Sequence, residues 1–535
     1  MKPLKACIFI LSCLVFFLPG SAAFSRQPGN SPQPDSIDQS VIQWMKEKKI
    51  PGASLVLVNG QQTIIRNYGN TGNSRGDKVT SNTLFEIGSC SKAFTAMAVM
   101  QLVTNGTLHL DKSVTDYLTW FRPTYKGVAA TITLRQLLHH TSGIPWETIA
   151  DIPEDDRPGA LGRTVRKLSA VKLHHKPGKE FEYATVNYDI LAFIIAETTG
   201  YTFERYLQDS VINRLGLTAT SVGVPADEAF MATGFKMGFL HAFPYQAPRY
   251  AGNNAAGYII SNATDIQKWL MFQMGLFPAP LYPLAVATQQ RDETVPLHGM
   301  AAYAMGWNVS LNGSGEIYHD GLNPNFSTYI AFRKKQQLGI ALLTNVNNSS
   351  TPLMGDRILR MLASDEIKKE GFPDDSNDGV YTLISLVLAM YILLLVAAMV
   401  FMCIQVARKK RMYERLSVKR ITKAGMALLA GLPFLGGVYC IPAAMAGFNW
   451  EAAIVWSPFS FKIMVMLILS AFLVSYIAYL LGFLFPAKNE LYSTMPKVLV
   501  LSIFSGIANM IIIALVTSSS ANKDADLKFL MLYYV

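Results

Sequence analysis

The segment that decides the fold is Phe85-Glu86-Ile87-Gly88-Ser89-Cys90-Ser91-Lys92-Ala93-Phe94-Thr95. It contains the pattern S-x-x-K, with Ser89 and Lys92 three positions apart. Gly88 can form a tight turn before the serine, and the apolar run Ala93–Met100 after the lysine contains good helix formers. A helix that begins here places both side chains one turn apart on the same face. It also places the serine at the positive end of the helix, where a developing alkoxide is favoured.

The surroundings of Lys92 predict a role in proton transfer. Apolar neighbours lower the pKa of a lysine, because burial disfavours the charged form. A lysine with a lowered pKa can accept or relay the proton of a nearby serine. Ser89 is therefore the candidate nucleophile and Lys92 the candidate base. The alternative, a solvated surface lysine, does not fit a position inside an apolar run.

Two other serines match short nucleophile patterns. Gly72-Asn73-Ser74-Arg75-Gly76 fits G-x-S-x-G, a pattern that requires a buried strand before it and a helix after it. The flanks here are polar, so we expect Ser74 to lie in a surface loop. Ser169-Ala170-Val171-Lys172 also matches S-x-x-K, and this second match shows that the pattern alone is weak.

The sequence on either side of this segment predicts an α/β fold with an antiparallel sheet. Ala53–Val58 and Thr63–Tyr68 read as strands around Asn59-Gly60, a strong hairpin signal. Near the far end, Phe326–Phe332 and Leu338–Thr344 form a second pair of strands. Helices are expected at Ile37–Lys48, Lys92–Thr104, Leu134–His139, Asn187–Thr199, Thr202–Arg214 and Thr264–Met274. We therefore expect one sheet built from both ends of the domain, with a large helical insertion.

The start of the chain predicts export. Residues 1–23 have a positive start, an apolar stretch and the small residues Ser21-Ala22-Ala23, as in a cleavable signal peptide. The alternative is an uncleaved anchor. Of the five cysteines, only Cys90 lies in residues 24–363, so no disulfide can form within that domain. The sequence has no Cys/His cluster with zinc spacing, and we expect neither a metal ion nor a cofactor.

After residues 364–379, a charged and turn-rich stretch that we interpret as a linker, the chain becomes apolar. Four runs are each long enough to span a bilayer: Tyr381–Cys403, Ala424–Ala446, Ile463–Phe485 and Val498–Thr517. Residues 380–535 are thus predicted to form an all-α transmembrane bundle of four helices. Eight basic residues between Arg408 and Lys423 supply much of the net charge of +10. This local cluster argues against a nucleic-acid partner.

The same basic connection predicts the orientation, because basic connections between spans stay in the cytoplasm. Residues 24–363 then face the periplasm or exterior of a bacterial inner membrane. The four runs contain no Asp, Glu, Lys, Arg or His, whereas transporters usually carry ionisable groups in their spans. We therefore interpret the runs as an anchor in the lipid bilayer, through which two copies could also pair as a homodimer.

Five blocks in one order resemble class C β-lactamases and their penicillin-binding and esterase relatives. They are Phe85–Thr95, Ile132–Gly143, Pro177–Tyr183, Ala256–Ser261 and His319-Asp320-Gly321, all between Ile37 and Leu362. The resemblance implies that Ser89 attacks a carbonyl group while Lys92 and Tyr183 move the proton as a coupled pair. It implies an oxyanion hole formed by the backbone N–H groups of Ser89 and Leu322. His319 and Gly321 stand in the family's K-T-G or H-x-G triplet and are expected to line the pocket.

One departure points to a narrower group. The family's Y-x-N motif reads Tyr183-Ala184-Thr185, so a threonine replaces the asparagine that usually contacts a substrate amide. Tyr183–Asp189, Asn323–Ser327 and Gln337–Ile340 resemble the membrane-bound peptidases that activate nonribosomal-peptide prodrugs, of the colibactin-maturing type. That resemblance implies removal of an N-acylated D-amino acid, typically acyl-D-asparagine, from an exported precursor.

By the same resemblance, the candidates for reading a short polar D-side chain are Glu86, Thr185, Gln246 and Asn323. Each has a structural alternative. Glu86 could cap the following helix, Asn323 could shape the turn before Pro324, and Gln246 lies in a loop without a clear pattern.

Other functions remain open. A cell-wall D-alanyl-D-alanine carboxypeptidase, a β-lactamase or an esterase would use the same nucleophile. A penicillin-sensing receptor needs an intracellular output domain, and the predicted inside connections are short. A non-catalytic binding protein would have no need to keep Ser89, Lys92 and Tyr183 together.

Overall fold

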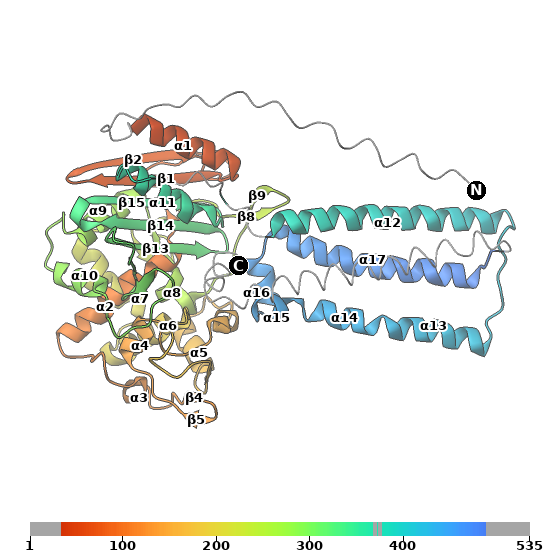
Figure 1. Ribbon diagram of the computed structural model, residues 1–535, viewed down its shortest axis with the longest axis horizontal. Coiled ribbons are helices and arrows are strands. Elements are labelled where there is room, and N and C mark those ends of the chain that lie inside the picture. Colours follow the sequence, from red (N-terminus) through yellow and green to blue (C-terminus); the bar gives the residue numbers. More distant parts are fainter. Residues whose placement is uncertain (1–33, 367–371, 373–376, 488–535) are drawn as a thin grey trace.

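The computed structural model describes residues 34–366, 372 and 377–487. An α/β domain at one end continues into a set of long helices that extend away from it, here called the helical unit (residues 377–487; Figure 1). The predicted signal peptide, residues 1–23, and the fourth predicted span, Val498–Thr517, lie outside the described residues.

A seven-stranded antiparallel sheet forms the centre of the α/β domain, in the order β11-β12-β13-β14-β15-β1-β2. Its strands are β1 (Gly52–Asn59), β2 (Gln62–Gly69), β11 (Ala301–Tyr303), β12 (Asn308–Ser310), β13 (Glu316–Asn323), β14 (Phe326–Arg333) and β15 (Leu338–Thr344). Both predicted hairpins are confirmed. They join where β1 pairs with β15, with Ala53 opposite Thr344.

Helices cover both faces of this sheet (Figure 1). Leu55 and Leu57 of β1 pack in one core with α1 (Pro34–Glu47) and α11 (Ser350–Leu362). Val56 and Val58, which point to the opposite face, pack in the main core with α2 (Ser91–Thr104) and α9 (Ala263–Met274). Because successive side chains of a strand alternate between faces, the apolar run Leu55–Val58 of β1 must be covered on both sides.

The chain between β2 and β11 is largely helical, as predicted. It contains α3 (Val114–Tyr117), α4 (Leu134–Leu138), α5 (Ala160–Lys167), α6 (Val186–Thr199), α7 (Phe203–Leu207), α8 (Asn254–Gly257) and α10 (Tyr282–Gln289), with α2 and α9. Short strands here are β3 (Phe85–Glu86), β4 (Thr124–Tyr125), β5 (Val128–Ala129), β6 (Lys172–Leu173), β7 (Ser221–Val222), β8 (Phe235–Gly238), β9 (His241–Pro244) and β10 (Ile259–Ser261).

One predicted helix in this region has a different form. Instead of one α-helix over Thr202–Arg214, α7 ends at Leu207 and the chain continues as a π turn and a 3₁₀ turn. The Ser210 hydroxyl donates to the Tyr206 carbonyl at 2.5 Å. Such side-chain bonds back to the previous turn compete with the regular helix.

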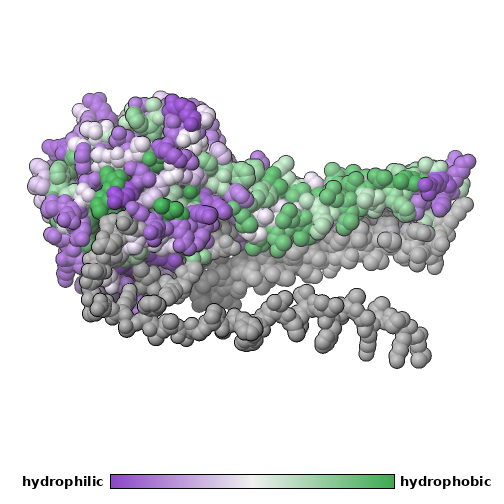
Figure 2. Space-filling model, turned by 90° about the horizontal axis from the view of Figure 1, so that it is seen from above, coloured by the Kyte–Doolittle hydropathy of each residue, from purple (hydrophilic) through white to green (hydrophobic). Residues whose placement is uncertain are grey.

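Three helical stretches of the helical unit are long and apolar enough to cross a membrane: Asp378–Ala407 (α12), Val418–Tyr439 and Phe459–Leu484 (α17). Hydrophobic residues dominate the visible surface of this unit, whereas polar residues dominate that of the α/β domain (Figure 2). The first and third predicted spans thus correspond to α12, which extends beyond the prediction at both ends, and to α17, which begins four residues earlier and ends one residue earlier.

The second predicted span, Ala424–Ala446, needs correction. The chain here divides into α13 (Val418–Ala430), α14 (Leu432–Tyr439) and α15 (Ile441–Ala446). The helix begins earlier than predicted because the Ser417 side chain caps it by accepting from the Arg420 N–H. Pro433 and Pro442 stand in the first turns of α14 and α15, where a proline is tolerated but the preceding helix cannot continue unchanged.

The short helix α16 (Trp450–Trp456) lies between α15 and α17. This region contacts the α/β domain. Asn449 Nδ2 donates to the Ala150 carbonyl at 2.9 Å, and Lys236 Nζ of β8 donates to the Ile454 carbonyl at 2.8 Å. The two units therefore meet along α16 and the 146–151 segment.

Candidate active site

Ser89 lies at the junction between β3 and α2. Residues Gly88–Cys90 form a 3₁₀ turn, and α2 follows from Ser91. Gly88 has a φ of +53°, and a Cβ there would lie 2.6 Å from the Leu322 nitrogen. Only glycine allows β13 to approach this closely. The predicted turn and helix are thus confirmed, with Ser89 in the turn itself, partly exposed between buried neighbours.

Lys92 points at the serine, as predicted. Its Nζ lies 3.0 Å from Ser89 Oγ, 3.2 Å from Thr185 Oγ1 and 2.8 Å from the Ala256 carbonyl oxygen. The side chain is fully buried. Burial lowers the pKa of Lys92 to about 7, against the opposing effect of the Asp189 and Asp320 carboxylates. A substantial neutral fraction near pH 7 makes this amine a suitable acceptor for the serine proton.

Tyr183 completes the group around Ser89. Its ring centroid lies 4.9 Å from Lys92 Nζ and 4.2 Å from the His140 ring. Its hydroxyl is buried and makes no hydrogen bond of normal geometry in the described part of the chain. Burial raises the pKa of Tyr183 well above its usual value, although nearby Ser89 acts to lower it. The phenol is therefore neutral at physiological pH and suited to donate a proton.

Strand β13 forms the opposite side of the site. Its pairing with β12 covers only Ile317 and Tyr318, and from His319 onward this edge lies against the 3₁₀ turn, where Cys90 Sγ donates to the His319 carbonyl at 3.3 Å. A Cβ on Gly321 would collide with the Ile87 carbonyl. The Leu322 nitrogen thus lies beside the turn that carries Ser89, and the predicted oxyanion hole would use the N–H groups of these two residues.

His319 is held in place within β13 by two close contacts. Its Nε2 lies 3.0 Å from the Tyr303 hydroxyl, and its Nδ1 lies 2.6 Å from the Asp320 carbonyl oxygen. Burial lowers the pKa of His319 to about 3. A neutral imidazole with both nitrogens engaged suits a residue that lines the pocket better than a general base.

The predicted substrate-reading residues fall into two groups. Asn323 Nδ2 donates to Glu86 Oε2 at 2.6 Å and to the Gly257 carbonyl at 2.9 Å, and Thr185 contacts Lys92. Burial raises the pKa of the Glu86 carboxyl to about 7, although the Asn323 bond lowers it. Gln246 is exposed in the loop after β9, and in the described part of the chain no hydrogen bond joins it to the others.

Three further side chains lie next to the site, although the sequence had not predicted a role for them. Asp189 is fully buried in α6 and close enough to Lys92 to influence its pKa. His140 accepts from the Ala184 N–H at 3.3 Å and packs on Tyr183. Tyr303 holds His319. His140 and Asp189 had a signal in the sequence, since they lie in the blocks Ile132–Gly143 and Tyr183–Asp189, whereas Tyr303 had none.

The rival serines have no such surroundings. Ser74 is exposed in a turn, as predicted. Lys172, the lysine of the second S-x-x-K match, is exposed in β6, and Ser169 does not begin a helix. Ser89 is therefore the serine with a buried lysine at hydrogen-bond distance.

Comparison with known proteins gives a consistent picture. The sequence model of the beta-lactamase family matches residues 37–364. Protein flp of Staphylococcus aureus (strain N315) is 26% identical over 434 residues, covering 80% of this chain and 86% of flp. The putative penicillin-binding protein PbpX of Bacillus subtilis (strain 168) is 30% identical over 333 residues, covering 61% of this chain and 78% of PbpX.

Solved structures show the same fold. A class C beta-lactamase superposes with a TM-score of 0.54 at 23% identity, covering 63% of this chain and 97% of the other. The octameric penicillin-binding protein homologue from Pyrococcus abyssi superposes with a TM-score of 0.53 at 23% identity, covering 63% of this chain and 78% of the other. With the family match over most of the chain, these comparisons show that the protein belongs to the beta-lactamase family and is a serine hydrolase of the β-lactamase and penicillin-binding type.

Proposed function

We propose that this chain is a membrane-anchored serine peptidase that hydrolyses the amide bond after an N-acylated D-amino acid, D-asparagine, and so activates an exported nonribosomal-peptide prodrug. The α/β domain faces the periplasm or exterior of a bacterial inner membrane. The enzyme's partners are the acylated precursor and the lipid bilayer. The observation that carries the proposal is the polar pair of Glu86 and Asn323 beside Ser89 and Lys92.

The mechanism follows from the geometry of the site. Ser89 Oγ attacks the carbonyl carbon of the acyl-D-amino acid while neutral Lys92 accepts the serine proton. The N–H groups of Ser89 and Leu322 stabilise the oxyanion of the tetrahedral intermediate. Tyr183 donates a proton to the leaving amine, which is the activated product, and regains a proton from the protonated Lys92, so that the serine proton ends on the amine. Water then hydrolyses the acyl-enzyme ester and releases the N-acyl-D-amino acid.

The polar pair suits a side-chain amide. Asn323 holds the Glu86 carboxyl in place through the 2.6 Å bond, and the second Glu86 oxygen can accept from the NH₂ group of an asparagine side chain. Thr185 stands where the family has asparagine, and its hydroxyl is engaged with Lys92 at 3.2 Å. These contacts support recognition of a polar side chain in place of the usual contact with a β-lactam or peptide amide.

A small pocket at the junction of the two units marks the side from which a bilayer-bound substrate would reach the site. It is lined by Tyr250 and Tyr258 of the α/β domain and by Glu451, Ala452 and Trp456 of α16, among others. Tyr258 follows Gly257, whose carbonyl accepts from Asn323. The pocket thus lies next to the polar pair and on the side of the apolar helices. Each buried methylene of an acyl chain favours partition into a bilayer by about 0.8 kcal/mol.

The substrate is tested with a pair of epimers. Detergent-solubilised full-length protein should cleave a fatty-acyl-D-asparaginyl amide about 10²-fold or more faster than the L-epimer, because a site built to hydrogen-bond one side-chain position rejects the alternative. The turnover of the D- and L-asparaginyl amides, followed by liquid chromatography, gives kcat/KM for each epimer. Glu86→Gln should reduce this discrimination.

The second candidate, a D-alanyl-D-alanine carboxypeptidase or a β-lactamase, is favoured by the similarity to PbpX. Faster turnover of a D-Ala-D-Ala peptide, or equal rates on the two asparagine epimers, would select it over prodrug activation.

The rate should depend on the ionisation of Lys92. Its pKa is lowered to about 7, and only the neutral amine accepts a proton. We therefore expect kcat/KM to rise with pH up to about 7 and then level off, with a loss of about tenfold per pH unit below it. Because Glu86 also titrates near pH 7, Glu86→Gln is the control. This variant should show the same loss of kcat/KM below pH 7. A kcat/KM that does not change between pH 5 and 8 would show that Lys92 is not the base.

A further inference from the structure

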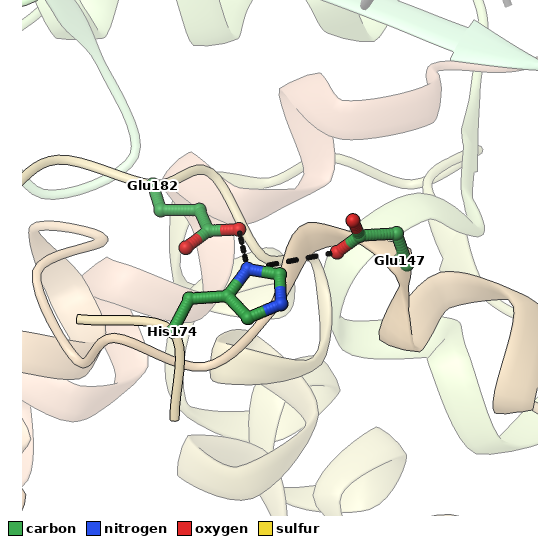
Figure 3. Close-up of side chains that lie close together, drawn as sticks. All are labelled: Glu147, His174 and Glu182. Carbon is green, nitrogen blue, oxygen red and sulfur yellow. Dashed lines mark hydrogen bonds and ion pairs between the residues drawn. The ribbon is translucent and has the colours of Figure 1, made fainter. Parts of the chain in front are cut away.

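Three side chains outside the Ser89 site bring metal-binding atoms together. Glu147, His174 and Glu182 point toward one another from separate segments of the α/β domain (Figure 3). Their ligand atoms all lie within 4.8 Å of one another. His174 Nδ1 is 3.1 Å from Glu182 Oε1 and 3.9 Å from Glu147 Oε2.

These distances suit one bound cation. In a tetrahedral site with bonds of about 2.1 Å, neighbouring ligand atoms are about 3.4 Å apart. Both measured separations, 3.1 and 3.9 Å, are close to that value, so small side-chain rotations would complete the geometry. An imidazole nitrogen with carboxylate oxygens is a ligand set used by Zn²⁺ and by other first-row divalent metals.

The surroundings of these three side chains also favour a bound cation. Glu147 Oε2 and Glu182 Oε2 are both shielded from solvent and form no hydrogen bond within the described residues. The cationic groups at ion-pair distance from them are histidines, His174 for Glu147 and His175, whose Nε2 is 3.3 Å from Glu182 Oε2. Buried carboxylate oxygens without hydrogen bonds are costly unless paired, and one cation between the two carboxylates would give both oxygens a partner.

We propose that Glu147, His174 and Glu182 bind a divalent metal ion of the zinc class, with the remaining coordination position taken by water. This site is distinct from the serine centre and does not depend on the substrate assigned above. The ion would pair with the two shielded Oε2 atoms, whereas Glu182 Oε1 already accepts from the Trp146 N–H at 3.0 Å.

The position of the site indicates a structural role. Glu182 immediately precedes Tyr183, and its N–H donates to the His140 carbonyl at 2.9 Å. Glu147 lies against the helical unit, where a Cβ on Gly447 would come 2.7 Å from its Cγ. The neighbouring ring of Trp146 lies 5.6 Å from that of Phe448. A bound ion therefore ties the segment that carries Tyr183 to the segment that contacts the helical unit.

The test uses full-length protein in detergent, stripped of metal with a chelator and titrated with ZnCl₂ by isothermal titration calorimetry. We expect one Zn²⁺ per chain in the wild type. His174→Ala and Glu147→Gln should each weaken binding at least about tenfold, since even changes to outer-shell partners of a metal cost this much. Glu180→Gln is the matched control. This glutamate lies on the same segment, its side chain is 62% exposed, and its ion pair is with His175.

Thermal unfolding of each metal-free variant shows whether it folds. If His174→Ala does not fold, Glu147→Gln decides the question, because it keeps the size and shape of the side chain. Zinc affinity that is equal in the wild type, His174→Ala and Glu147→Gln would overturn the proposal, and so would a folded wild type that binds no zinc. Loss of affinity in Glu180→Gln equal to that in Glu147→Gln would also overturn it.

Discussion

Replacing Ser89 with alanine is expected to abolish hydrolysis, with kcat/KM about 10⁴-fold or more below the wild type, because the change removes the attacking oxygen and nothing else. Lys92 would lose its 3.0 Å contact with Ser89 but keep those with Thr185 and the Ala256 carbonyl. The pocket should therefore persist in the variant. The measurement is turnover of the acyl-D-asparaginyl amide by purified protein, together with thermal unfolding to confirm that the variant folds.

Ser74→Ala is the control for this experiment. Ser74 also matches a nucleophile pattern, but it is exposed in a turn and should tolerate the change with little effect on activity or stability. Loss of activity in Ser74→Ala with retention in Ser89→Ala would show that the nucleophile has been assigned to the wrong serine.

The sheet shows which parts of the fold can be predicted from local sequence. The hairpin of β1 and β2 carries its own signal, since two apolar runs flank Asn59-Gly60, and β14 and β15 are similarly clear. Strand β13 was not predicted. It contains Glu316, His319 and Asp320, and its polar side chains are stabilised by partners distant in sequence, such as Arg333, which forms a buried ion pair with Glu316 at 2.9 Å.

The residues of the site also differ in whether a local sequence pattern predicts their contacts. The S-x-x-K spacing and the apolar run behind it predicted the contact between Ser89 and Lys92, because both residues lie on one helical turn. Tyr183 was found only through the family resemblance. The contact between Glu86 and Asn323 depends on β3 and β13 meeting across the fold, which no local pattern encodes.

The group of Glu147, His174 and Glu182 was missed for a related reason. Its members follow no metal-binding spacing in the sequence and are brought together by three separate segments, of which the one carrying Glu147 is a 3₁₀ helix. A search for zinc motifs therefore leads to the expectation of no metal, whereas the folded chain offers three ligands. In residues 418–446, the Ser417 cap and the prolines of α14 and α15, rather than hydropathy, set where the helices begin, which is why the second span was misplaced.

Lys92→Ala and Tyr183→Phe are each expected to lower kcat by about 10²- to 10⁴-fold, the contribution typical of a positioned proton-transfer group. The double variant should be far less impaired than the product of the two effects, because coupled groups act as a unit. Tyr188→Phe is the matched control. Its buried hydroxyl donates to the Leu138 carbonyl at 2.9 Å, and its ring lies 5.8 Å from Lys92 Nζ.

This control should lose about 1 kcal/mol of stability but keep most of its activity, because its hydroxyl bonds to backbone and does not face the serine. Single-turnover rates on the acyl-D-asparaginyl amide, measured above pH 7 where Lys92 is neutral, separate the chemical step from binding. Full activity in Lys92→Ala or in Tyr183→Phe would exclude that residue from proton transfer. Strictly multiplicative effects would show that Lys92 and Tyr183 do not pass the proton between them and act independently of each other.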